Sequence, residues 1–201
     1  MTDPEAAARR LDRQIAFLTE ADRLKTVLRA TPITDQSRPE NSAEHSWHLA
    51  LYALILADHA RPGVNIDRVI RMLILHDLVE IDVGDVPIHA NGGQSHASHA
   101  RLADEAAAAD RIFGLLPDDL ATDLRALWDE FEEARTEDAI FAKSLDRVQP
   151  VLMNLASGGG SWRDYAVTLD QVETRVGTKV ARGAPRLWQA LQLRLKQFFN
   201  A

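Results

Sequence analysis

The sequence predicts an all-α protein, and three observations lead to that prediction. Apolar residues recur at helical spacing through nearly all of the 201 residues. No segment alternates apolar and polar residues with the β-branched and aromatic enrichment of a strand. Proline- and glycine-containing stretches such as "RPG" and "SGGGS" separate the helical segments. The length suits one domain, 1–201, with 162–201 as a C-terminal helical extension.

The first helix is expected from about Pro4 to Leu28, where apolar residues follow helical spacing. A polar loop should follow, because each proline of "ATPITDQSRPE" disfavours helix in the residue before it. The second helix should begin at "NSAEH", where Asn41 or Ser42 can cap it and Glu44 lies in capping-box position. It continues through "LALYALILA", which is so apolar that other helices should surround it.

The third helix, Ile66 to about Ile81, is apolar around most of its circumference until it reaches "HDLVEIDVGD". Gly84 and Pro87 should end it in a turn. The later segments are predicted from the same helical spacing and from the proline and glycine residues between them. They are a loop at 91–98, helices at Ala100–Phe113, Pro117–Ala134 and Glu137–Leu155 with an interruption at Pro150, a flexible connection at 157–161, and helices at Trp162–Ala181 and Pro185–Phe199.

The composition limits which partners and metal ligands the protein can have. The net charge of −7 and the scattered Lys and Arg residues leave no basic stripe, so duplex DNA or RNA is not expected as a partner. The chain has no cysteine, so any metal must bind to His and carboxylate side chains. No stretch reaches the roughly 18 apolar residues of a membrane span, and the simplest expectation is a soluble, cytoplasmic protein without membrane contact.

Four residues stand out at the ends or middle of buried helices: His45, His76, Asp77 and Asp146. A buried carboxylate is costly unless it is paired or binds a cation, so these acids favour a metal site. Two imidazoles and two carboxylates suit a divalent transition metal with positions left open for water and substrate. The alternative is that each histidine is a hydrogen-bonded core residue and each aspartate a capping or solvated acid.

The order of these residues resembles the ligand pattern of the HD-domain metal-dependent phosphohydrolases, namely a His, an adjacent His-Asp pair and a distant Asp. The 5'-deoxynucleotidase branch is closest, because it has motifs similar to "RPENSAEHSWHLA" and "HDLVEIDVGDVP". The similarity covers roughly residues 15 to 155. It implies an HD-domain helical bundle, a metal site between the central helices, and His45, His76, Asp77 and Asp146 as the metal ligands.

The resemblance also implies catalytic roles for Glu80 and Asp85 and a phosphate contact for Arg29. Helical spacing agrees for Glu80, which lies one turn beyond the His-Asp pair and near the metal. It can orient a water or move a proton, or alternatively hydrogen-bond His76. Ala30 occupies the position where the bacterial nucleotidase has a tryptophan, so the resemblance does not imply selection for a 2'-deoxy sugar.

The expected function is hydrolysis of (deoxy)nucleoside 5'-monophosphates by a homodimer that uses one divalent ion: Mn, Co, Fe, Zn or Mg. Other nucleotides, such as a triphosphate, an alarmone or a cyclic nucleotide, remain alternatives because a metal site recognises only phosphate. A non-catalytic metal-binding scaffold and a helical oxidoreductase with two irons are the alternatives from other classes.

Overall fold

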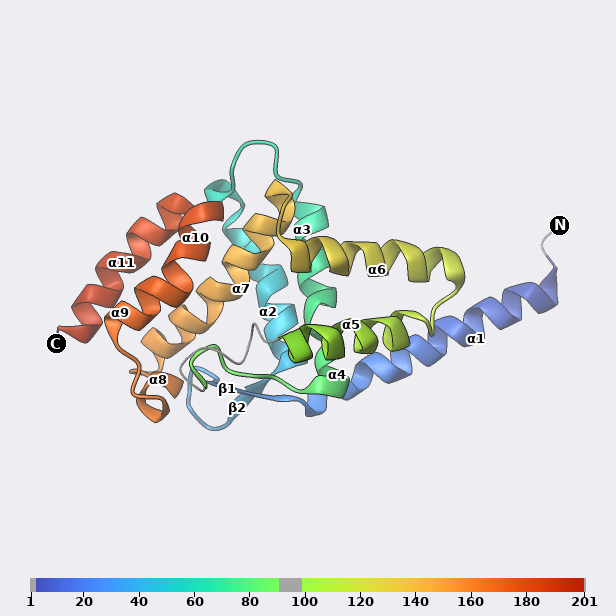
Figure 1. Ribbon diagram of the computed structural model, residues 1–201, viewed down its shortest axis with the longest axis horizontal. Helices are drawn as coiled ribbons and strands as arrows, with labels where there is room; N and C mark the ends of the chain where they lie inside the picture. The colour runs from blue at the N-terminus through green and yellow to red at the C-terminus, as the bar shows by residue number, and fades with distance from the viewer. Residues whose placement is uncertain (1–2, 91–98, 201) are drawn as a thin grey trace.

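The computed structural model describes residues 3–90 and 99–200 and is predominantly helical, as predicted (Figure 1). Helix α7 (Glu137–Ala156) lies at the centre. It contacts α2 (Ser42–Ile55), α3 (Ile66–Leu75), α6 (Asp118–Glu133) and α10 (Thr178–Gly183). Its buried side chains explain this position, because they occupy most sides of the helix. They are Ala139, Ile140, Phe141, Ala142, Ser144, Leu145, Val148, Gln149, Val151 and Asn154.

The predicted first helix is too long at its C-terminal end. Helix α1 spans Pro4–Ala21, a 3-10 turn covers Asp22–Thr26, and the chain is extended from Val27 onward. The polar loop expected next is instead a short antiparallel hairpin of β1 (Leu28–Pro32) and β2 (Pro39–Asn41). Its two prolines face each other at the open end, where a missing N–H costs no ladder hydrogen bond. Strands this short show no alternation that sequence could reveal.

Helix α2 (Ser42–Ile55) has the predicted capping box. The Asn41 side chain accepts a hydrogen bond from the Glu44 backbone N–H at 2.9 Å, and the Glu44 carboxylate accepts one from the Asn41 N–H at 3.2 Å. The expectation that other helices surround α2 is wrong. One side is exposed and carries large apolar side chains: Trp47, Leu51, Leu54 and Ile55.

Helix α3 (Ile66–Leu75) ends earlier than predicted, directly before the His-Asp pair. A 3-10 turn (His76–Val79) and the short helix α4 (Glu80–Val83) replace its expected last turns. The tighter turn exposes backbone carbonyls for other partners, and Trp128 Nε1 donates to the His76 carbonyl at 3.1 Å. Gly84, with φ 70°, ends α4.

Helices α5 (His99–Phe113) and α6 (Asp118–Glu133) agree with prediction within a residue, whereas the predicted loop at 91–98 lies outside the described residues. The predicted interruption at Pro150 is wrong, since α7 continues through it. Proline removes one backbone hydrogen bond, but burial of the helix on several sides keeps it continuous.

The segment expected to be a flexible connection is a hydrogen-bonded turn. Gly159 N–H donates to the Asn154 carbonyl at 2.7 Å, and Ser161 Oγ donates to Asn154 Oδ1 at 3.1 Å. Gly158, Gly159 and Gly160 have φ values of 62°, 117° and 41°, which glycine adopts without steric cost. The turn therefore directs the following chain back along α7.

The first predicted C-terminal helix is divided, because Ala166 adopts a left-handed conformation (φ 47°). The pieces are α8 (Ser161–Asp164), α9 (Leu169–Val172), a π-helical turn (Glu173–Gly177) and α10 (Thr178–Gly183). Helix α11 (Pro185–Phe199) matches its prediction. Figure 1 shows α9, α10 and α11 together beside α7, whereas α1 extends from the opposite end of the molecule.

Close packing of α10 on α7 depends on Gly183. A Cβ atom there would lie 2.7 Å from the Ile140 carbonyl oxygen and would also collide with Ser144 Oγ. We expect Gly183→Ala to lower the free energy of unfolding by about 1–3 kcal/mol, since this contact leaves no room for a methyl group. Urea denaturation measures the change, and the exposed Arg182→Ala serves as control with an effect within about 0.5 kcal/mol. Equal stability of both variants would contradict the assigned packing.

Candidate metal centre

Three side chains from separate elements meet inside the bundle: His45 in the first turn of α2, His76 at the 3-10 turn after α3, and Asp146 in the middle of α7. One potential ligand atom from each lies within 4.8 Å of the others. Both histidines are buried, and Asp146 is mostly so. The sequence separation of these residues is large, so only the packing of α2, α3 and α7 brings them together.

The hydrogen bonds of both imidazoles leave one nitrogen facing this cluster. His76 Nδ1 lies 2.8 Å from the Leu73 carbonyl and must donate to it, so Nε2 is the free nitrogen. His76 Nε2 is buried and has no hydrogen-bond partner among the described residues. His45 Nδ1 lies 3.1 Å from Gln149 Oε1, which leaves its Nε2 3.2 Å from Asp146 Oδ1. These are the tautomers that metal ligation requires.

Gln149 fixes the orientation of His45 through a second set of contacts. Its Nε2 donates to Glu40 Oε1 at 2.7 Å and lies 3.3 Å from His48 Nδ1. The amide oxygen of Gln149 must therefore face His45. A neutral amide anchored by a carboxylate holds the imidazole in place, as residues behind metal ligands commonly do.

Asp77, the remaining predicted ligand, borders the cluster. Its Oδ1 lies 2.9 Å from His76 Nε2 but not in hydrogen-bonding geometry, and its Oδ2 accepts a hydrogen bond from Arg29 Nη1 at 3.0 Å. Two imidazole nitrogens with neighbouring carboxylate oxygens form a donor set that fits a divalent transition metal. The unpartnered His76 Nε2 is the specific observation that supports this fit.

Electrostatics keep both aspartates ionised. Burial alone would raise the pKa of Asp146, but Arg147 and the neighbouring imidazoles of His45 and His76 hold it well below its usual value. Burial also opposes ionisation of Asp77, whose pKa is lowered to about 2 by His76 and Arg29. Burial would lower the pKa of His76, yet Asp77 and Asp146 raise it to about 10. A metal ion must displace that proton to bind, so its affinity should rise with pH.

Glu80 and Asp85 lie close to the cluster but differ from its ligands in protonation. Burial, followed by repulsion from Asp77, raises the pKa of Glu80 well above its usual value. Ser42 Oγ donates to Glu80 Oε2 at 2.5 Å and fixes its orientation. Burial also raises the pKa of Asp85 despite the attraction of Arg29. A carboxyl group with a raised pKa can hold and transfer a proton near neutral pH.

Arg29 lies among these acids. Its Nη1 is 3.6 Å from Asp85 Oδ1 and 3.9 Å from Glu80 Oε1, in addition to the hydrogen bond with Asp77. Its Nε is 3.7 Å from Glu40 Oε2. Arg29, which is predicted to contact a phosphate, therefore lies at the site, where several carboxylates surround its positive charge.

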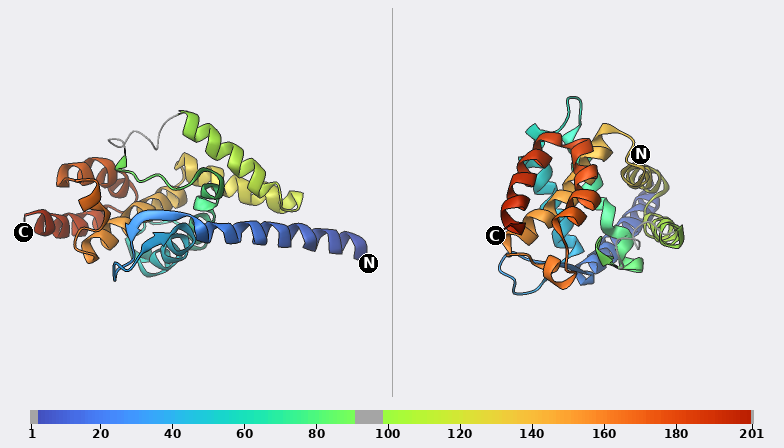
Figure 2. Two further views of the ribbon diagram at one scale, coloured as in Figure 1. Left: turned by 90° about the horizontal axis from the view of Figure 1, so that it is seen from below. Right: turned by 60° about the vertical axis from the view of Figure 1, so that its left-hand side comes forward.

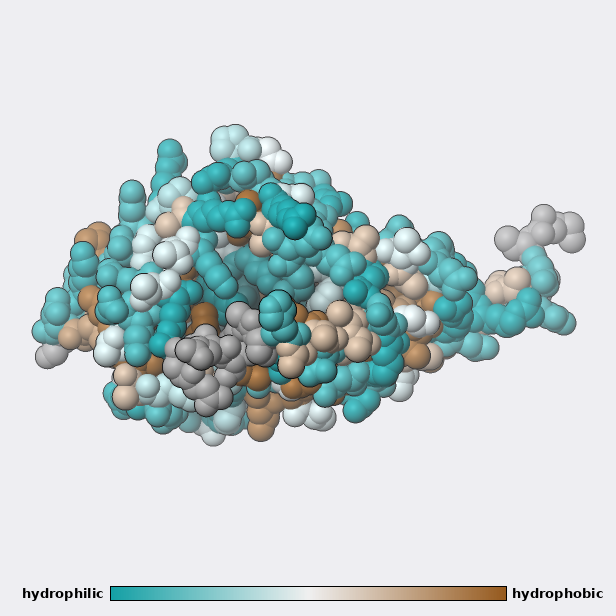
Figure 3. Space-filling model, in the orientation of Figure 1, coloured by the Kyte–Doolittle hydropathy of each residue, from teal (hydrophilic) through white to brown (hydrophobic). Residues whose placement is uncertain are grey.

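The cluster opens into a cavity of about 300 Å³, within the range of small-molecule sites. Figure 3 shows a hydrophilic recess near the middle of this face of the molecule. Several lining residues were not singled out from the sequence, because they reach the cavity only through tertiary packing. They are Arg101, Lys143, Arg147, Trp162, Tyr165 and Lys179.

The helical bundle and its buried His-His-Asp cluster define a protein with a metal-compatible site. The HD domain model matches residues 21–188, and the chain belongs to the HD-domain family, which confirms the resemblance predicted from the motifs.

Relatives and a solved structure agree with this assignment. The 5'-deoxynucleotidase HDDC2 of Xenopus laevis is 33% identical over 142 residues, covering 70% of this chain and 67% of that protein. A 5'-deoxynucleotidase of Erwinia tasmaniensis is 30% identical over 161 residues, covering 77% and 81%. The crystal structure of a predicted metal-dependent phosphohydrolase from Magnetospirillum magnetotacticum superposes with a TM-score of 0.87 at 43% identity and 96% coverage of both chains.

Proposed function

We propose that the chain is a metal-dependent 5'-nucleotidase that hydrolyses (deoxy)nucleoside 5'-monophosphates to nucleoside and phosphate. The observation that carries the proposal is a buried His-His-Asp cluster that opens, beside Glu80, into a cavity of about 300 Å³. The similarity to 5'-deoxynucleotidases supports the substrate class, and the HD domain supports phosphoester hydrolysis.

In this proposal His45, His76, Asp77 and Asp146 hold one divalent ion. When bound, such an ion lowers the pKa of water and offsets negative charge developing on the phosphate. The donor set accommodates Mn, Co, Fe, Zn or Mg, and the metal used is left to experiment. Gln149 keeps the His45 ring in its binding orientation through the hydrogen bond at Nδ1.

Glu80 takes a proton from the attacking water or donates one to the leaving nucleoside oxygen. Its raised pKa and its fixed orientation by Ser42 support this role. Asp85, which also lines the cavity, binds a sugar hydroxyl or assists the leaving oxygen. Arg29 contacts the phosphate, because an Asp77 carboxylate shared with a metal ion holds the guanidinium less tightly.

The test is a substrate and metal screen. Purified protein stripped of metal is assayed for phosphate release from ribo- and deoxyribonucleoside 5'-monophosphates, with 3'-monophosphates, triphosphates and cyclic nucleotides in parallel, each with Mn, Co, Fe, Mg and Zn. We expect metal-dependent turnover of 5'-monophosphates. Ala30 lines the cavity, so the same screen measures the ribose preference directly.

Three results would contradict the proposal. Turnover confined to triphosphates or cyclic nucleotides would change the substrate class, and tight metal binding without turnover would indicate a scaffold. Two tightly bound irons per chain would favour oxidoreductase chemistry. Asp77→Ala supplies the control, since any contaminating phosphatase activity would persist in it.

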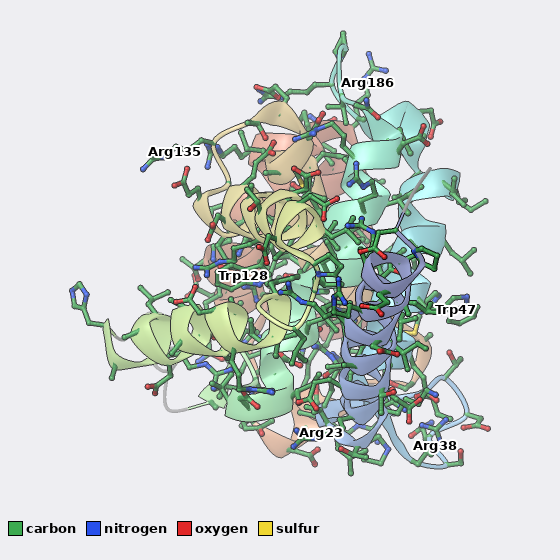
Figure 4. The ribbon with its side chains drawn as sticks, turned by 90° about the vertical axis from the view of Figure 1, so that its right-hand side faces the viewer. Arg23, Arg38, Trp47, Trp128, Arg135 and Arg186 are labelled. Carbon is green, nitrogen blue, oxygen red and sulfur yellow. The ribbon has the colours of Figure 1, made fainter. Side chains whose placement is uncertain are left out.

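We further propose a homodimer in which exposed apolar faces of α1 and α2 are covered. Helix α1 projects as an arm beyond the body of the molecule (Figure 2). Phe17 is the one residue of α1 that is buried. Trp47 points outward from α2 and is 63% exposed (Figure 4). Exposed apolar residues at helical spacing on both helices support an interface. They are Leu11, Ile15, Leu18, Trp47, Leu51 and Leu54.

Replacement of Trp47 with glutamate should dissociate the dimer, because it introduces a charge into the apolar face. Light scattering coupled to size-exclusion chromatography gives the mass, expected to fall from two chains to one. Arg135→Glu also adds negative charge, but to another surface (Figure 4), and should leave the mass unchanged. A monomeric wild-type protein, or equal masses for both variants, would exclude this interface.

None of the described helices is long and apolar enough to cross a membrane. A cytoplasmic location stays a prediction. The same holds for the absence of nucleic acid and membrane partners, and for the organisation as one domain with a C-terminal extension.

A further inference from the structure

We infer that Lys179 of α10, together with Arg147 of α7, binds the phosphate group of the substrate. The C-terminal helices would then form part of the substrate site. This inference rests on the proposed function for the identity of the substrate, but the anion site itself follows from the charges that line the cavity.

Most basic side chains of the cavity are already neutralised. Arg29 lies among carboxylates and is available to a phosphate only when a metal ion shares Asp77. Arg101 contacts Glu105 at 2.7 Å and donates to the backbone carbonyls of Val83 and Gly84 at the end of α4. Lys143 Nζ lies 2.9 Å from Glu132 Oε2 and 4.4 Å from the ring centroid of Phe131. An incoming anion would have to compete with these partners.

Arg147 and Lys179 differ from the other cavity cations. The nearest acid to Arg147 is Asp146, 3.6 Å from its Nε, and that carboxylate belongs to the proposed metal site. The same Nε is buried and, like that of Arg29, has no hydrogen-bond partner among the described residues. Lys179 forms no ion pair with an acid in the part of the chain that the structure describes. Both side chains line the cavity.

The two cations also repel each other. Arg147 is the main cause that lowers the pKa of Lys179, ahead of burial and of Lys143. Asp146 and Glu132 each attract Lys179 less strongly than Arg147 repels it, and an anionic ligand would offset that repulsion. A phosphate dianion would neutralise the pair and restore the ordinary proton affinity of Lys179.

The backbone holds this pair in place. Ser144 Oγ lies 3.3 Å from the Lys179 carbonyl, and the absence of a side chain at Gly183 lets α10 approach α7 closely. Arg147 follows Asp146 directly in α7, so an anion next to the metal cluster is also next to Arg147. The cluster and the basic pair can therefore engage opposite sides of one phosphate, with a guanidinium and an ammonium as its donors.

The test compares Lys179→Gln with Arg182→Gln. Arg182 is also in α10 and loses the same charge, but it is exposed and does not line the cavity. Inorganic phosphate is titrated calorimetrically into each Mn-loaded protein, and KM and kcat for a deoxynucleoside 5'-monophosphate are measured in parallel. We expect Lys179→Gln to weaken phosphate binding and to raise KM by about 10-fold or more, the effect of losing one charged hydrogen bond.

Arg182→Gln should stay within about twofold of wild type, and Lys179→Arg should restore phosphate binding because it returns the cation. Equal phosphate affinity in Lys179→Gln and Arg182→Gln would overturn the inference. Thermal unfolding of Lys179→Gln, with metal content, separates loss of binding from loss of fold.

The outcomes also distinguish this inference from the proposed function. Phosphate binding that depends on Lys179, without hydrolysis of any mononucleotide, would preserve the anion site and exclude the nucleotidase. Hydrolysis with unchanged phosphate affinity and KM in Lys179→Gln would preserve the nucleotidase and exclude the anion site.

Discussion

Replacement of Asp146 with asparagine is expected to abolish metal-dependent hydrolysis almost completely. The loss should exceed the roughly 10- to 100-fold effect of changing a residue that only supports a metal ligand. Among the described residues, Asp146 is the carboxylate that lies within 4 Å of Nε2 of both imidazoles, at 3.2 Å from His45 Nε2 and 3.7 Å from His76 Nε2. Asparagine keeps the shape but removes the negative charge that attracts a cation.

Metal content by elemental analysis, a metal titration and kcat/KM measure this effect together. Asp119→Asn is the matched control, because that carboxylate lies on the surface of α6 and pairs with Arg10 far from the site. Asp146→Asn with wild-type metal content and turnover would place the metal elsewhere and remove the basis of the hydrolase proposal.

The second large effect is expected for Glu80→Gln, which should lower kcat by about 10²- to 10⁴-fold, as loss of a general acid or base does. Metal affinity should change little, because the His-His-Asp cluster does not include Glu80. The glutamine retains the hydrogen bond with Ser42 but cannot exchange a proton.

Asp82→Asn in the same short helix is the control for Glu80→Gln, since its carboxylate faces Arg111 instead of the cavity. Its kcat should remain near that of wild type. Loss of metal from Glu80→Gln would show that Glu80 is a metal ligand. Full kcat in this variant would show that Glu80 has no part in catalysis.

Sequence patterns predict the parts of this structure that depend on neighbouring residues. The capping box of Asn41 and Glu44 is local, so it could be predicted and is confirmed. The His-Asp pair is visible because its members are adjacent. The positions of His45 and Asp146 in buried helices marked them as candidates, and the resemblance to HD-domain proteins implied that they bind one metal ion together with the pair.

Other features depend on contacts between distant segments. Nothing near Lys179 indicates a cavity, because only the close packing of α10 on α7 brings it beside Arg147. An all-apolar stretch does not reveal which side of α2 stays exposed. Likewise, the expectation that Pro150 interrupts its helix applies to an isolated helix. In the folded protein, burial of α7 on several sides compensates for the lost backbone hydrogen bond.

The central position of α7 also affects the kinetics of the site. A helix enclosed by α2, α3, α6 and α10 opens only when most of the core opens with it, so its backbone amides should exchange hydrogen almost as slowly as global unfolding permits. Asp146 and Arg147 therefore hardly leave their positions during turnover. Ions and nucleotides must therefore reach the site through the cavity and not through an opening of the helix.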